Sequence, residues 1–103
     1  MPEPFAMGGK LLAQPGQRDA LVEILLEAAR LLGDMPECEH YIVNTVPEEP
    51  DAVWVTELWA SEEAHGASLE REDVRALIQR AMPLIAGMTD QVRLTPVGGK
   101  GIE

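Results

Sequence analysis

Residues 53–59, with the sequence VWVTELW, constrain the fold of this chain more than any other segment. Their β-branched and aromatic side chains favour an extended strand. Side chains two apart on a strand share a face, so Glu57 and Trp59 lie on one face while Trp54 and Leu58 lie on the other. Both faces are therefore expected to be at least partly covered. A carboxylate in that setting is either paired for structural reasons or placed at the wall of a cavity.

The charge of the chain excludes two classes of partner. It has 18 acidic and 8 basic residues, a formal net charge of −10. Phosphate backbones and anionic lipids would be repelled, so we expect neither a nucleic acid nor a membrane partner. The start, MPEPF, lacks the features of a signal peptide, and no apolar run reaches the roughly 18 residues of a membrane span. We therefore expect a cytoplasmic protein.

The length and composition indicate a single globular domain. A chain of 103 residues with 46% hydrophobic and 25% charged residues can bury one modest core. We expect this domain to span residues 1–97, followed by a flexible, glycine-rich tail at residues 98–103. The single cysteine, Cys38, cannot form an internal disulfide, and no Cys or His residues have zinc-site spacing. No metal is therefore expected.

The spacing of apolar residues predicts the element order β-α-β-β-α-β. Strand patterns cover residues 5–13, 39–46, 52–59 and 89–97, and the main helical patterns cover residues 17–32 and 74–85. Ser61 is expected to cap a short helix after the third strand, and Pro83 to kink or end the last helix. This order predicts an α+β, ferredoxin-like fold, with an antiparallel sheet and its helices on one face.

Several short motifs occur on these elements in an order typical of a known family. They are Pro15-Gly16, Cys38 with Tyr41, Glu57-Leu58-Trp59 with Ser61, Glu63-Ala64-His65, Leu69, and Val74-Arg75. With these motifs the chain resembles the antibiotic biosynthesis monooxygenase family, small dimeric α/β-barrel proteins that include quinol and anthrone monooxygenases and haem-degrading enzymes. The resemblance extends over most of the chain.

The resemblance implies a homodimer in which two sheets associate face to face, and a cavity in each subunit between its sheet and helices. Glu57 and Trp59 would face that cavity, and Trp54 and Leu58 would face the partner sheet. The implied activity is a cofactor-independent monooxygenase that uses dioxygen to oxidise a quinol-like or polycyclic aromatic substrate, without flavin, haem or metal. The protein would supply orientation, desolvation and proton transfer.

The chain also departs from the family at positions that often hold histidine. Ser68 stands at one such place, and Asp73 or one of its neighbours at the other. In the haem-degrading branch, the positions of an asparagine and an iron-binding histidine correspond to Gly9 and Gln79, so haem chemistry is not expected.

Two residues are candidates for the catalytic role. His65 is the first choice for a general base, because an ordinary imidazole pKa of about 6.5 suits proton abstraction near neutral pH. Its alternative is a surface position on a helix. Glu57 is a second polar or basic group, and its alternative is a structural ion pair with an arginine such as Arg75.

Three further residues are candidates for substrate binding. Trp59 is expected to stack on a flat ring, or else to be ordinary core packing. Tyr41 and Gln79 are expected to orient oxygen substituents of the substrate, although a half-buried strand tyrosine needs no function. Two other functions stay open: a non-catalytic dimeric ligand-binding or stress-response protein, and an isomerase or cyclase on the same fold.

Overall fold

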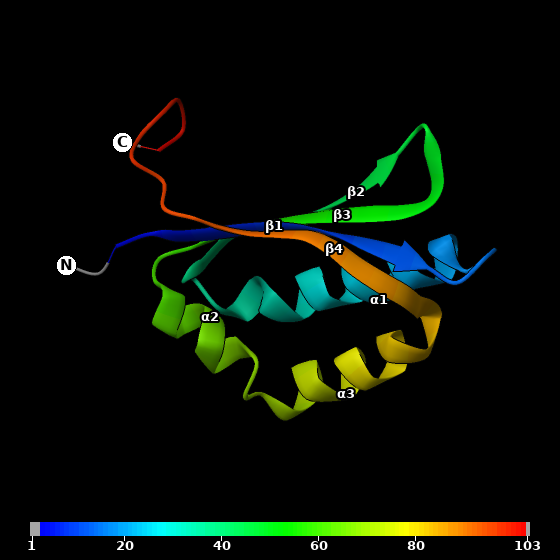
Figure 1. The fold of residues 1–103 in the computed structure, drawn as a ribbon. Helices are drawn as coiled ribbons and strands as arrows, with labels where there is room; N and C mark the ends of the chain where they lie inside the picture. The colour runs from blue at the N-terminus through cyan, green and yellow to red at the C-terminus, as the bar shows by residue number, and fades with distance from the viewer. Residues whose placement is uncertain (1–2, 103) are drawn as a thin grey trace.

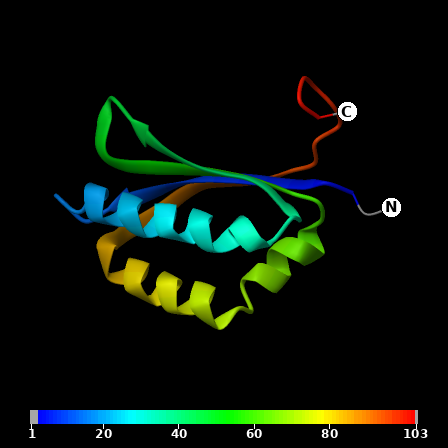
Figure 2. The same cartoon turned by 180° about the vertical axis from the view of Figure 1, so that it is seen from behind.

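One antiparallel sheet and one layer of helices make up the computed structural model, which describes residues 3–102. The strands are β1 (Phe5–Ala13), β2 (Cys38–Val46), β3 (Glu49–Trp59) and β4 (Ile85–Leu94), in the sheet order β2-β3-β1-β4. The helices are α1 (Arg18–Leu31), α2 (Glu62–Ser68) and α3 (Glu72–Ala81), with short 3₁₀ segments at Leu32–Asp34 and Met82–Leu84. Figures 1 and 2 show that the three α-helices lie on the same side of the sheet. The predicted α+β, ferredoxin-like fold is confirmed.

The ends of the helices follow local sequence signals. The Ser61 hydroxyl caps α2 by accepting a hydrogen bond of 3.1 Å from the backbone N–H of Ala64. Glu62 and Glu63 occupy the first turn of α2, where the positive end of the helix dipole favours acidic side chains. Pro83 lies in the 3₁₀ segment that follows α3, so the predicted early end of this helix is confirmed.

The third strand begins earlier than its sequence pattern predicted. The segment from Pro47 onward was expected to break the chain until Ala52, but only Pro47 and Glu48 form the turn. Val46 already pairs with Glu49, so the hairpin closes there. Cross-strand pairing thus extends β3 into a segment whose prolines and acidic residues have low strand propensity.

The last strand is displaced toward the N-terminus relative to the prediction of residues 89–97. It runs from Ile85 to Leu94, and these residues pair with Ala13 and Ala6 of β1. Ile85 therefore starts a strand, whereas its spacing had placed it in the last helix. Pairing along nearly the whole length of β1 outweighs the local helical pattern.

The core lies between the sheet and the helices and has two clusters of buried side chains. The first consists of Phe5, Leu32, Trp59 and Val74, and the second of Ala13, Leu21, Val53 and Ala81. Leu21, Val53 and Trp59 are fully buried. None of the helices within residues 3–102 is long and apolar enough to cross a membrane.

The face of the sheet opposite the helices carries apolar side chains that remain exposed in the single chain. Ile42, Val92 and Leu94, from the two edge strands, are 49%, 48% and 52% exposed. Trp54 on this face is half-buried, and Leu58 is buried within the chain. The exposed part of the face is therefore formed mainly by the edge strands, not by the two β3 residues expected from the sequence.

Replacing Leu21 by alanine should lower the free energy of unfolding by about 2–5 kcal/mol, because the side chain is fully buried and its removal leaves a cavity. Leu26→Ala on the same helix is the matched control, since Leu26 is 36% exposed. We expect a change within about 1 kcal/mol for the control. Urea unfolding of both variants checks this, and equal losses would contradict the described packing of α1.

Candidate functional site

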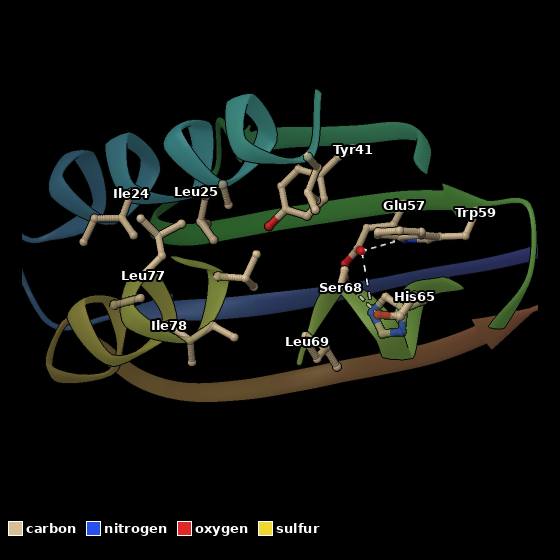
Figure 3. Close-up of a pocket in the computed structure, with 14 residues that line it drawn as sticks. Ile24, Leu25, Tyr41, Glu57, Trp59, His65, Ser68, Leu69, Leu77 and Ile78 are labelled. Atoms are coloured by element: carbon tan, nitrogen blue, oxygen red, sulfur yellow. Dashed lines mark hydrogen bonds and ion pairs between the residues drawn. The ribbon is translucent and has the colours of Figure 1, made fainter. Parts of the chain in front are cut away.

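A cavity of about 120 Å³ lies between the sheet and the helices, between the two core clusters. Its apolar walls come from α1 and α3, including Leu25, Leu77 and Ile78. The polar side chains in its lining come from β2, β3 and α2: Tyr41, Glu57, His65 and Ser68. Figure 3 shows the Glu57, His65 and Ser68 side chains together at one end of the cavity. The side chains labelled at the other end are all apolar: Ile24, Leu25, Leu77 and Ile78. Such an arrangement suits a mostly apolar ligand with a polar end.

The register of the sheet places the β2 and β3 side chains in the cavity wall. Tyr41 pairs directly with Glu57, so the two side chains stand on the same face. Farther along, Cys38 pairs with Trp59 and His40 pairs with Leu58, which leaves one extra residue in β2. This bulge lets Cys38 and Tyr41, three residues apart, both face the helices.

Glu57 has two polar partners at one carboxylate oxygen. The indole Nε1 of Trp59 donates a hydrogen bond of 3.0 Å to Glu57 Oε1, and His65 Nε2 lies 3.8 Å from the same atom. The pKa of Glu57 is raised by burial, while the Trp59 hydrogen bond and the nearby His65 act in the opposite direction. The predicted partner Arg75 is exposed, and within residues 3–102 it forms no ion pair with Glu57. The carboxylate is thus both paired and part of the cavity wall.

His65 is held in the interior rather than on the helix surface. Its side chain is 17% exposed. The imidazole centroid lies 5.4 Å from the Phe5 ring and 5.3 Å from the Trp59 ring. The Ser68 hydroxyl donates a hydrogen bond of 2.6 Å to the His65 carbonyl oxygen near the end of α2. The imidazole is therefore fixed beside Glu57 at the polar end of the cavity.

Trp59 takes part in the site mainly through its indole N–H. The residue is fully buried and packs in the first core cluster. This position favours the core-packing alternative over open stacking on a ligand. Its hydrogen bond nevertheless fixes the orientation of the Glu57 carboxylate.

Tyr41 can donate a hydrogen bond into the cavity. Burial and the negative charge of Glu57 raise the pKa of its phenol, so the hydroxyl keeps its proton near neutral pH. In Figure 3 this hydroxyl points toward the space between the helices. The same two causes raise the pKa of Cys38, which favours the unreactive thiol form.

The structure brings together four of the five predicted site residues. Tyr41, Glu57, Trp59 and His65 all line the cavity, whereas Gln79 is exposed on α3 and is absent from the lining formed by residues 3–102. Sequence reasoning had not assigned Ser68 to the lining. Leu77 and Ile78 belong to the apolar helical pattern predicted over residues 74–85. That pattern is the sequence signal for this part of the cavity wall.

The arrangement can accept a proton from a ligand and stabilise the resulting charge. A histidine next to a buried carboxylate is a common general-base arrangement, because the carboxylate favours the protonated imidazole. Among residues 3–102, no group of three or more His, Cys, Asp or Glu side chains is placed to hold a metal ion.

Comparison with known proteins identifies relatives of the whole fold. The family model described as "Antibiotic biosynthesis monooxygenase" matches residues 4–80. A crystal structure from Chloroflexus aurantiacus J-10-fl, named as a candidate antibiotic biosynthesis monooxygenase, is 45% identical, with a TM-score of 0.87 and coverage of 97% of this chain and 99% of that one. No match was found among curated proteins.

More distant structures share the fold. A candidate antibiotic biosynthesis monooxygenase from Caulobacter crescentus CB15 is 22% identical, with a TM-score of 0.85, over 94% of this chain and 92% of that one. The protein PA3566 from Pseudomonas aeruginosa is 16% identical, with a TM-score of 0.83, over 95% and 98% of the two chains. The fold thus recurs at low sequence identity.

Replacing Trp59 by phenylalanine should raise the pKa of Glu57 further, because the substitution keeps an aromatic ring but removes the N–H that stabilises the carboxylate. A pH titration followed by carbon-13 NMR of the labelled Glu57 carboxyl measures this pKa. Trp54→Phe is the matched control, since Trp54 lies on the opposite face of β3, and it should leave the Glu57 pKa unchanged. An unchanged or lower Glu57 pKa in Trp59→Phe would refute the assigned role of this hydrogen bond.

Proposed function

Because the chain belongs to the antibiotic biosynthesis monooxygenase family, we propose that it is a cofactor-independent monooxygenase acting on a quinol-like or polycyclic aromatic substrate. The single observation that carries this proposal is the Glu57–His65 pair at the polar end of an apolar cavity. An aromatic substrate needs apolar walls for its rings and a base for its acidic proton. Both are present in one cavity.

The reaction starts with transfer of a proton from the substrate to His65. The substrate anion then gives one electron to dioxygen, and the resulting radical and superoxide combine to form a C–O bond. The peroxide takes the proton back from the imidazole, and loss of water breaks the O–O bond and leaves a carbonyl group. For an anthrone-type CH₂ group the balance is CH₂ + O₂ → C=O + H₂O. The substrate is oxidised, and one oxygen atom is reduced to water.

Three further side chains of the cavity each have a distinct part in this reaction. The Glu57 carboxylate stabilises the imidazolium that forms when His65 takes the proton. The Trp59 N–H keeps that carboxylate in place. The Tyr41 hydroxyl donates a hydrogen bond to an oxygen of the substrate, which favours the anion. Apolar walls from α1 and α3 exclude water from the anion.

Loss of the His65 imidazole should lower turnover by about 100-fold or more. The assay measures oxygen uptake with anthrone and substituted hydroquinones, with a chelator present and no added flavin. His40→Ala is the matched control, because His40 is the other histidine of the chain and is exposed on β2. We expect full activity in the control.

Two outcomes of this assay would change the proposal. If His65→Ala keeps the wild-type rate and pH profile, His65 is not the base and Glu57 becomes the next candidate. If no anthrone, hydroquinone or related phenol raises oxygen uptake above its rate of autoxidation, the monooxygenase function is wrong. The cavity would then belong to a non-catalytic ligand-binding protein.

The functional unit in this proposal is a homodimer formed through the open face of the sheet. Ile42, Val92 and Leu94 place apolar side chains on both edge strands of that face. Ile42 and Val92 belong to one row that crosses the sheet through Thr56 and Gly8. A second copy related by a two-fold axis would present the same surface and cover these side chains.

Light scattering should give about twice the 11.2 kDa mass of the chain. The double variant Ile42→Glu/Val92→Glu should be monomeric, because carboxylates would be buried without partners at the contact. Met82→Glu is the control, since Met82 is 55% exposed but lies with the helices, and it should stay dimeric. A monomeric wild-type protein at micromolar concentration would exclude this assembly.

A further inference from the structure

A second hollow of about 170 Å³ adjoins the cavity on the same side of the sheet. Residues of α1 and of all four strands line it, mostly from β1 and β4. Leu25, Tyr41 and Glu57 line both spaces. Figure 3 shows these three side chains in the wall of the first cavity. The two spaces therefore share part of their lining, formed by these three side chains.

The size of each space corresponds to about one aromatic ring. An apolar cavity of about 150 Å³ in another protein is large enough to bind benzene. The two hollows, of about 120 and 170 Å³, lie on either side of this value. Together they suit a ligand of two rings, with Tyr41 and Glu57 near its middle.

A bulge in β4 directs the side chain of Gln91 into the second hollow. Val92 pairs with Gly8 and Thr89 pairs with Lys10, so two β4 residues stand opposite Gly9 alone. Asp90, the first of these two, has a left-handed backbone conformation with φ of 56°. The extra residue shifts the alternation of side chains by one position. As a result Met88 and Gln91, three residues apart, both line the hollow.

Contacts on either side of Gly9 stabilise this arrangement. A Cβ atom at position 9 would overlap the Gln91 carboxamide, so glycine leaves the space that this side chain occupies. Asp90 accepts a hydrogen bond of 3.2 Å from the Thr89 hydroxyl and lies 4.0 Å from Lys10 Nζ. These contacts place one carboxamide at the end of the second hollow.

The Gln91 carboxamide can bind an oxygen substituent of a ligand. Its Nε2 donates one hydrogen bond of 3.4 Å to the Thr89 carbonyl oxygen. The second N–H and the carbonyl oxygen Oε1 can then serve a ligand hydroxyl, which both donates and accepts. We propose that Gln91 is a binding residue for a second oxygen substituent, so that the site selects two-ring aromatic compounds with oxygen at both ends. This inference rests on the proposed function, because it takes the cavity to be the substrate site.

The test compares two ligands by calorimetry under nitrogen, so that no oxidation can occur. The ligands are 1-naphthol and 1,5-dihydroxynaphthalene, which differ by the distal hydroxyl. Wild-type protein should bind the diol more tightly by about fivefold beyond its twofold statistical advantage, the effect of one net hydrogen bond. In Gln91→Leu only the twofold advantage should remain, while 1-naphthol should bind as it does to the wild-type protein.

Two further variants separate this role from a general effect on folding. Gly9→Ala should lose the same preference, because the added methyl group displaces the flexible Gln91 side chain while residue 91 is still glutamine. Gln14→Leu, at an exposed position in the turn after β1, should keep the full preference. Two results would overturn the assignment of Gln91. One is that Gln91→Leu keeps the preference for the diol, and the other is that it binds both ligands more weakly by the same factor.

The binding measurement and the oxygen assay fail in different ways. If the diol preference depends on Gln91 but no phenol is oxidised, the binding role of Gln91 is supported and the proposed monooxygenase function is wrong. If the wild-type protein oxidises phenols but no preference depends on Gln91, only the present inference is wrong.

Discussion

The site depends on the hydrogen bond from the Trp59 indole to the Glu57 carboxylate. Burial raises the pKa of Glu57, so the charged form needs a donor to persist inside the protein. A fully buried tryptophan supplies that donor from the same face of β3. The carboxylate thus held lies beside His65 and across the strand pair from Tyr41. Among residues 3–102, the polar contact left to the buried carboxylate without this bond would be the longer one with His65.

Periodicity was enough to predict the order of the elements but not all their ends. The helix cap at Ser61 and the end of α3 near Pro83 are local effects, and the sequence carries both signals. The starts of β3 at Glu49 and of β4 at Ile85 depend on pairing with strands elsewhere in the chain. Propensity within one segment cannot reveal such pairing, which is why both predictions began several residues too late.

The site was only partly predictable for a related reason. Glu57 and Trp59 share a face by simple alternation, and family resemblance added His65 and Tyr41. The bulge in β2 and the bulge in β4 opposite Gly9 shift that alternation by one residue. No pattern in a single sequence marks them. Gln91 was therefore missed. The correspondence with the family suggested Gln79, and this residue does lie on α3. Its side chain, however, is exposed and is absent from the cavity lining formed by residues 3–102.

In the proposed reaction, a substrate occupies the cavity with its acidic oxygen or carbon next to His65. A crystal structure of the protein grown with 1-naphthol under nitrogen tests it most directly. We expect the rings to lie between α1 and α3, with the hydroxyl oxygen within about 2.6–3.2 Å of the His65 imidazole or the Tyr41 hydroxyl. A ligand bound instead on the open face of the sheet, or in the polar hollow beside Phe5 and Arg93, would contradict it.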